Sequence, residues 1–288
     1  MTGIAMNYLL RLRLPVLTLL AILSVGLVLK YNKDNDYLLL YADQFIVESD
    51  SQTEKVVKLV SAIRENVRSK RNQGAIFLPI FRFLRPTAVQ VARSGSGDCA
   101  DKSRLLINLL HLHGIEASKV ALYDDQGIPQ HAVVEVHIGE DQKMAVDALY
   151  GLYFPRTASE TFYSVRDITN DESILRNRIT ELLMSNTDNY KPSLQRYPFH
   201  KYTYNQPRSI NWDKSEVLKF VYKISRLIIG ERVNSIERPY FVERPVLMIL
   251  YSVLTIMILI AASYVPAVIQ MLYRHNTTAN SQDGIGND

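Results

Sequence analysis

The sequence predicts an α+β fold held between two membrane-spanning helices, and three observations lead to this prediction. Two runs without charged side chains lie towards the ends of the chain, at residues 14–29 and 245–273. Between them, a leucine-rich segment with helical periodicity is followed by three short segments of strand character separated by turns. One helix followed by neighbouring antiparallel strands is the pattern of an α+β domain.

The first uncharged run predicts a transmembrane helix at residues 14–30. Arg13 and Lys30 flank it, and such long side chains reach the polar interface, so a run slightly shorter than about 20 residues can still span. A cleaved signal peptide is the alternative interpretation. Because no small-x-small cleavage motif precedes Lys30, we expect an uncleaved anchor.

The second uncharged run, residues 245–273, lies between Arg244 and Arg274 and is long enough to span with tilt. Pro266 is expected to kink this helix or to mark its interfacial end. Two spans place both termini on the same side of the membrane.

Charge near the first span predicts the orientation. Arg11 and Arg13 precede the first span, which favours a cytoplasmic N-terminus and a periplasmic or extracytoplasmic domain in a two-pass inner (cytoplasmic) membrane protein. Arginines before the second span favour the opposite orientation, but long loops translocate largely regardless of charge. The predicted organisation is a short cytoplasmic N-terminus (1–13), a transmembrane helix (14–30), a helical lead-in (31–85), a core (86–154), a helical, tyrosine-rich extension (155–244), a second transmembrane helix (245–273) and a disordered tail (274–288).

Composition limits the classes of partner. The formal net charge is +4, and the basic residues are scattered among nearly as many carboxylates without a basic stripe or an RNA-binding motif, so nucleic acid is not expected as a partner. One cysteine, Cys99, excludes an intrachain disulfide. A lone cysteine is by default a small buried apolar residue, so its surroundings decide whether it has a function.

The soluble part begins with helical patterns and continues as a meander. The expected helices are residues 51–73, 87–93, 171–185 and 213–229, with a further helix that has Cys99 in its first turn and stops at Gly114, and the expected strands are residues 118–123, 131–138 and 143–149. The tyrosine-rich segment before Trp212 has two interpretations. It either packs as an extended cover along the domain or lines an aromatic substrate groove.

Cys99 is predicted to lie in the first turn of a largely buried helix. Gly95 and Gly97 permit a tight turn before it, Asp98 is a good N-cap, and Gly114 suits the residue after the helix end. The positive end of a helix dipole favours a thiolate, which is the nucleophilic form of cysteine. First-turn backbone amides could also stabilise an oxyanion.

Two further residues are expected to complete a Cys-His-Asp acyl-transfer site. His131 is the candidate ion-pair partner of the Cys99 thiolate, and Asp147 is the candidate that orients the imidazole. Strand parity supplies a test, because a three-residue loop at residues 139–141, or a bulge, would oppose Asp147 to Val133 and place it on the face of His131. A regular two-residue hairpin would put the two side chains on opposite faces.

These three segments resemble a known family. Gly97-Asp98-Cys99-Ala100-Asp101-Lys102-Ser103, with the leucine-rich helix after it, resembles the nucleophile segment of the transglutaminase-like superfamily. His131-Ala132-Val133-Val134-Glu135-Val136 resembles its histidine strand, and Met144-Ala145-Val146-Asp147-Ala148, with Tyr150-Gly151 following, is similar to its aspartate strand. The resemblance covers about residues 85–154, a quarter of the chain. It departs from the family at two packing positions, where Ala132-Val133 and Lys143-Met144 stand in place of a common aromatic residue and a common Trp, so the chain resembles a divergent branch.

The resemblance implies a papain-like cysteine-protease superfamily core, with an N-terminal helix that carries the cysteine, next to an antiparallel sheet. It implies a bacterial, membrane-anchored enzyme that attacks a peptide or carboxamide carbonyl through Cys99, His131 and Asp147, without a cofactor or a metal. The acyl-enzyme would pass to an amine (cross-linking) or to water (hydrolysis), and the partner would be a protein or peptide substrate. Two alternatives remain: a papain-like or cell-wall cysteine peptidase, and a non-catalytic scaffold in a cell-envelope assembly or export complex whose partners are unknown.

Overall fold

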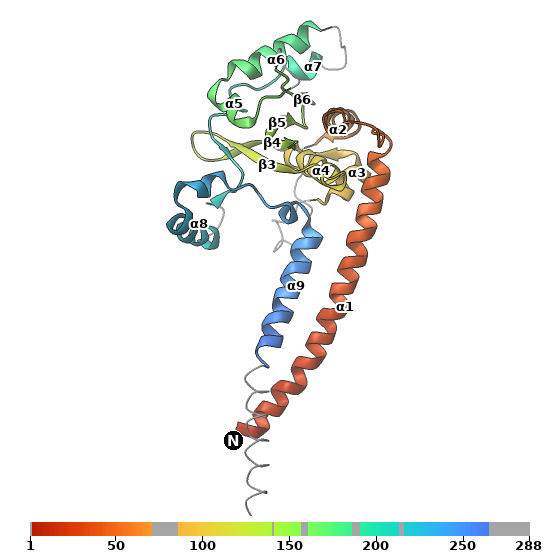
Figure 1. Cartoon of the computed structure of the whole chain (residues 1–288), viewed down its shortest axis with the longest axis vertical. Helices are drawn as coiled ribbons and strands as arrows, with labels where there is room; N and C mark the ends of the chain where they lie inside the picture. Colours follow the sequence, from red (N-terminus) through yellow and green to blue (C-terminus); the bar gives the residue numbers. More distant parts are fainter. Residues whose placement is uncertain are drawn as a thin grey trace, which may run out of the picture. The chain divides into compact units, whose positions relative to one another are not determined.

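The computed structural model describes residues 2–70, 86–139, 141–156, 161–185, 191–212 and 216–264. The chain forms two compact units, one of residues 1–33 with 246–288 and the other of residues 34–245. Figure 1 shows the helices and strands of both units.

The first unit contains most of two apolar helices. Helix α1 is Thr2–Ala42 and α9 is Pro245–Ala262, and each is long and apolar enough to cross a membrane. Ser24 Oγ lies 3.7 Å from Met257 Sδ, so the two helices contact each other within this unit (Figure 1). Helix α1 continues without a break from the predicted span, which ends at residue 30, into the predicted helical lead-in as far as Ala42, because no Pro or Gly interrupts residues 30–42. Of the predicted second span, residues 265–273, with Pro266, lie outside the described residues, as does the tail at 274–288.

The second unit is built on a five-stranded antiparallel sheet in the order β6-β5-β4-β3-β7. Its strands are β3 (Ala117–Tyr123), β4 (Pro129–Ile138), β5 (Gln142–Asp147), β6 (Leu152–Tyr153) and β7 (Pro207–Arg208). A parallel pair of two-residue strands, β1 (Arg68–Ser69) and β2 (Ser96–Gly97), lies just before the segment that carries Cys99. The α+β arrangement with an antiparallel sheet, predicted from the sequence, is confirmed.

Helices cover both faces of this sheet. The helices of this unit are α2 (Gln52–Asn66), α3 (Ala88–Ser94), α4 (Cys99–Leu112), α5 (Val165–Asn170), α6 (Ser173–Met184), α7 (Lys191–Leu194) and α8 (Glu216–Ile229), with 3-10 turns η3 (Gly230–Ser235) and η4 (Tyr240–Glu243); α8 has no buried residue. Figure 1 shows α2, α3 and α4 gathered on one side of the sheet and α5 and α6 on the other. Helix α2 ends at Asn66, earlier than predicted, and residues 71–73 of the predicted helix lie outside the described residues.

The hydrophobic core follows strand alternation. Val134, Val136, Met144 and Val146 pack with α2 and α4 in one buried cluster. The intervening positions Val133 and Ala145 belong to a second cluster, with residues of α5, α6 and α7. Because successive strand residues point to opposite faces, burial of both sets fixes the register of β4 and β5.

The β4–β5 connection decides where Asp147 lies. Ile138 pairs with Gln142, so the loop is the three residues 139–141, and the pairing Val134–Val146 continues towards a position of Asp147 opposite Val133. Gly139 has a φ of 65°, a left-handed conformation that glycine adopts without steric cost. The odd connection predicted from the sequence is therefore confirmed, and it places Asp147 on the same face as His131.

Candidate functional site

Cys99 is the first residue of α4, as the sequence predicts. Asp98 is the N-cap, and a reciprocal capping box holds the turn: Asp101 N donates to Asp98 Oδ1 (3.0 Å), and Asp98 N donates to Asp101 Oδ2 (3.2 Å). A Cβ on Gly97 would lie 2.9 Å from Asp101 Cβ, so this position cannot carry a side chain without displacing the cap. The local sequence thus fixes the place where the thiol is presented, half-buried at the positive end of the helix.

His131 and Asp147 form a buried pair. The distance from His131 Nε2 to Asp147 Oδ2 is 2.7 Å, and neither side chain is exposed to solvent. A carboxylate only accepts hydrogen bonds, so the proton lies on Nε2 and the imidazole donates. The other carboxylate oxygen, Oδ1, accepts from the backbone N–H groups of Leu149 (2.9 Å) and Tyr150 (3.2 Å). The turn after β5 therefore orients Asp147, and Asp147 orients His131.

The charge on His131 depends on both neighbours. Burial by itself lowers the pKa of His131, but the Asp147 carboxylate opposes it with its charge and hydrogen bond, and the Cys99 side chain adds to this effect. The net result raises the pKa of His131 to about 10. Nδ1 is buried without a hydrogen-bond partner of ordinary geometry among the described residues, so it is the ring nitrogen left to face the thiol. The arrangement favours an imidazolium beside Cys99 at neutral pH.

Helix α4 is joined to β4 beside the imidazole. Ser103 Oγ donates to the carbonyl oxygen of Ala132, the residue after His131, at 3.3 Å. Lys102, one turn after Cys99, is only 1% exposed, and burial lowers its pKa to about 8, with the nearby Asp147 carboxylate opposing the shift. A buried cation close to Asp147 was not predicted from the sequence, since a Lys in a helix is usually solvated.

Aromatic side chains surround the imidazole. Tyr202 stacks on His131, with ring centroids 4.1 Å apart and planes 8° from parallel, and Tyr150 meets the same ring edge-on at 6.2 Å. Tyr197 packs against Tyr150 at 4.7 Å and is buried in the second hydrophobic cluster. These contacts support the interpretation of the tyrosine-rich segment as a cover that crosses the site; Tyr190 lies outside the described residues. The sequence showed a tyrosine-rich composition but no signal that would single out Tyr202.

The stack predicts a specific effect on access to the thiol. The Tyr202 ring covers one face of His131 and lies close enough to the Cys99 charge for burial and that charge to raise the pKa of Tyr202. Replacing Tyr202 with Ala is expected to increase several-fold the ratio of Cys99 alkylation rates for a bulky maleimide over iodoacetamide. Tyr202→Phe keeps the ring and should leave this ratio unchanged. An equal ratio in all three proteins would show that the ring does not limit access.

Comparison with known proteins identifies part of the chain. Residues 40–148 match the model of the transglutaminase-like superfamily, a match that starts well before the region in which the motifs resemble the family. The comparison with curated proteins gave no match. A crystal structure from Parabacteroides distasonis ATCC 8503, described as a "putative protease", is 18% identical over 42% of this chain, with a TM-score of 0.30. The chain covers 27% of that protein, and a likeness of this size supports no conclusion. Residues 40–148, less than half of the chain, are therefore similar to the transglutaminase-like superfamily.

Proposed function

We propose that the chain is a membrane-anchored, transglutaminase-like cysteine enzyme that transfers acyl groups from peptide or carboxamide bonds. The observation that best supports this proposal is the buried imidazole of His131, which pairs with the Asp147 carboxylate and lies near enough to Cys99 for that side chain to raise the pKa of the imidazole. Burying a histidine and a carboxylate costs free energy. Their pairing beside a thiol at a helix N-terminus therefore indicates a chemical role.

The proposed reaction has two halves. The Cys99 thiolate attacks the carbonyl carbon, and the His131 imidazolium donates its proton to the nitrogen that leaves, so an amine departs and a thioester remains on Cys99. The now neutral imidazole then takes a proton from an amine or a water as it attacks the thioester, and Cys99 leaves as the thiolate. Transfer to an amine cross-links proteins, and transfer to water is hydrolysis.

The first turn of α4 is the proposed site for the oxyanion. Of its amides, Asp101 N donates to the Asp98 side chain and Lys102 N donates to the Asp98 carbonyl oxygen (2.9 Å). The amides of Cys99 and Ala100 are therefore the donors that we assign to the oxyanion, in the field of the helix dipole.

Anchoring is the second part of the proposal. Helices α1 and α9 are the proposed transmembrane spans of a protein of the inner (cytoplasmic) membrane, with a cytoplasmic N-terminus and the domain on the periplasmic or extracytoplasmic side. The substrate would be a protein or peptide exposed on that side.

Reaction of the single cysteine tests the chemistry, because any thiol adduct on this chain is an adduct of Cys99. At pH 6 a free thiol is about 0.3% thiolate. A thiolate–imidazolium pair should therefore alkylate up to about 100-fold faster than glutathione, after allowance for its lower nucleophilicity. Incubation with carbobenzoxy-glutaminylglycine should give a thioester adduct by intact-mass measurement, with hydroxylamine capturing the acyl group.

The control variants separate the roles. Cys99→Ala should give no adduct, and His131→Ala should alkylate at the rate of an ordinary thiol. If wild-type Cys99 reacts no faster than glutathione at pH 6, the proposed activation is wrong. Retained cellular function of Cys99→Ala would instead favour the scaffold alternative.

A further inference from the structure

Helix α8 carries an apolar face that the second unit leaves exposed. All of its residues are half-buried or exposed, although nine of its fourteen side chains are apolar or aromatic. The exposed fraction is 71% at Val217, 64% at Phe220, 87% at Leu227 and 77% at Ile228. Positions 217, 220, 221, 224 and 228 recur at helical spacing, so these side chains form one continuous face. Water-soluble monomers rarely expose such a patch.

The other side of the helix is cationic. Lys219, Lys223 and Arg226 are spaced four and three residues apart, which places them together on one side. Glu216 is the sole carboxylate of α8 and lies 2.8 Å from Lys219. Three cations against one carboxylate leave the helix with a positive charge, next to a wide apolar face.

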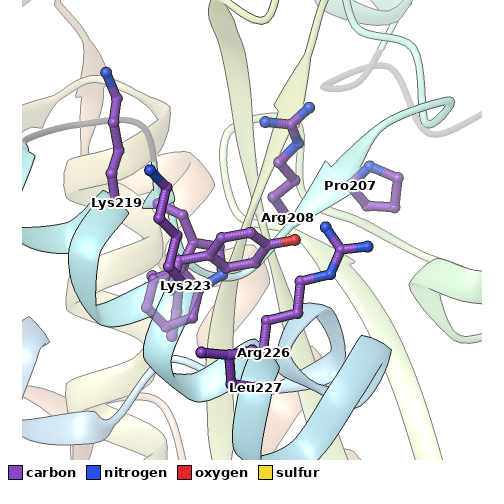
Figure 2. A pocket seen from close by; sticks show the side chains of 9 residues that line it. Pro207, Arg208, Lys219, Lys223, Arg226 and Leu227 are labelled. Atoms are coloured by element: carbon purple, nitrogen blue, oxygen red, sulfur yellow. The ribbon is translucent and has the colours of Figure 1, made fainter.

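These cations line a hollow beside α8. Its volume is about 1010 Å³, and Arg208 from β7 contributes a fourth cation (Figure 2). Trp212 and Tyr222 also line the hollow, with ring centroids 5.6 Å apart. Cys99, His131 and Asp147 do not line it, so the hollow is separate from the candidate acyl-transfer site.

This combination suits the interface of an anionic bilayer. Helices that lie in such an interface have a large apolar face and a Lys- and Arg-rich polar face, and each cation strengthens binding to anionic lipids. The chain itself supplies the second argument. Only residues 230–244 separate α8 from α9, a tether of at most about 50 Å. A helix so close in sequence to a candidate membrane span is held near the membrane surface if that span is inserted.

We infer that α8 lies in the headgroup region of an anionic phospholipid bilayer, with Phe220, Leu227 and Ile228 in the acyl layer and lipid phosphates at Lys223, Arg226 and the hollow. This inference rests on the anchoring part of the proposed function and does not depend on its chemistry. Bilayer contact would also hold the domain against the membrane surface on which its substrate is presented.

Spin labels on the full chain in nanodiscs test the inference. Cys99→Ser leaves the chain without cysteine, so one introduced cysteine carries the only nitroxide. Ile228→Cys reports on the apolar face near the C-terminal end of α8, and Val217→Cys repeats the measurement near its N-terminal end. Glu216→Cys is the matched control at a charged position. Discs of phosphatidylcholine alone are compared with discs that also contain phosphatidylglycerol, using oxygen and a nickel chelate as collision reagents.

In discs with phosphatidylglycerol, labels at 228 and 217 should be accessible to oxygen and protected from nickel, and the label at 216 should show the reverse. Adding Lys223→Gln and Arg226→Gln should lower the ratio of inserted to exposed label about 25-fold, about fivefold for each cation.

Three outcomes would overturn the inference. Incorporation of the chain with nickel-accessible labels at both apolar positions would refute it and leave anchoring intact. Protection from both reagents, regardless of lipid, would show a protein partner or a second copy on this face. Failure to incorporate would refute anchoring as well. Alkylation of wild-type Cys99 tests the chemistry separately, so the two failures are distinguishable.

Discussion

Asp147→Asn is expected to slow acylation of Cys99 by between about 10²- and 10⁴-fold while leaving the fold intact. An asparagine can still accept from the Leu149 and Tyr150 amides through its oxygen, which leaves its NH₂ group facing His131 Nε2. Nε2 must then accept, so the neutral imidazole carries its proton on Nδ1, the nitrogen that faces the thiol. Protonated Nδ1 of this neutral imidazole cannot accept the proton of the Cys99 thiol.

The same substitution should change the pH dependence. The pKa of His131 in the folded protein, about 10, lies above its unfolded value of about 6.5. The ion pair therefore stabilises the fold fully below about pH 6.5, and this stabilisation is lost as the pH rises through about 10. Removing the carboxylate lowers the pKa of His131, so the stability deficit of Asp147→Asn should be largest in acid and shrink towards pH 10.

Acylation rates by stopped flow and thermal unfolding across pH measure these two effects. Asp141→Asn is the matched control, since Asp141 is exposed in the neighbouring hairpin loop. A rate within about threefold of wild type would show that Asp147 does not hold the imidazole in its reactive tautomer.

Glu243→Gln is expected to destabilise the second unit by about 3–5 kcal/mol. Glu243 is 2% exposed and is surrounded by Lys119 (2.7 Å), Arg104 (3.2 Å) and Arg238 (2.8 Å). Burial opposes ionisation, but these cations lower the pKa of Glu243 to about 2. Without the carboxylate, three cations are left close together with no anion to compensate them, which is the costly way to break a buried ion pair.

Lys119→Met should be far milder, within about 1 kcal/mol of wild type. Burial lowers the pKa of Lys119 to about 7, despite the Glu243 charge. Of the three cations, Lys119 is therefore the one whose charge is lost most readily in the fold, and two arginines remain to compensate Glu243. The larger loss of stability for Glu243→Gln than for Lys119→Met would distinguish a cluster in which Glu243 compensates several cations from simple packing.

Thermal unfolding of the full chain in nanodiscs measures both variants. We expect Glu243→Gln to lower the midpoint by about 10 °C, since 1 kcal/mol corresponds to about 2–4 °C at this domain size. The Glu243 contribution is present above about pH 4.5 and is lost as the pH falls towards about 2. Equal decreases of the unfolding midpoint for Glu243→Gln and Lys119→Met would contradict this role of Glu243.

The sequence by itself determined the local frame of the candidate site. The Asp98 cap places Cys99 at the start of α4, and a left-handed Gly139 in a three-residue loop sets the register that brings Asp147 to His131. Helix caps, turn glycines and the alternation of apolar residues along a strand each depend on a few neighbouring residues, so they can be predicted from the sequence. The helix ends were less well determined: α1 runs past the predicted span to Ala42, and its last turns place Leu38 and Ala42 in a buried core cluster of the second unit.

Only the tertiary structure decided which distant side chains complete this frame. Tyr202 reaches His131 across 71 positions of sequence, and Glu243 meets Lys119 across 124. The exposure of the apolar face of α8 was equally undetermined, because the same amphipathic pattern predicts a helix packed on a core. Long-range contacts form only when the elements pack together in three dimensions. No local sequence pattern specifies which tyrosine will contact the site, which carboxylate will be buried or which helix face will remain exposed.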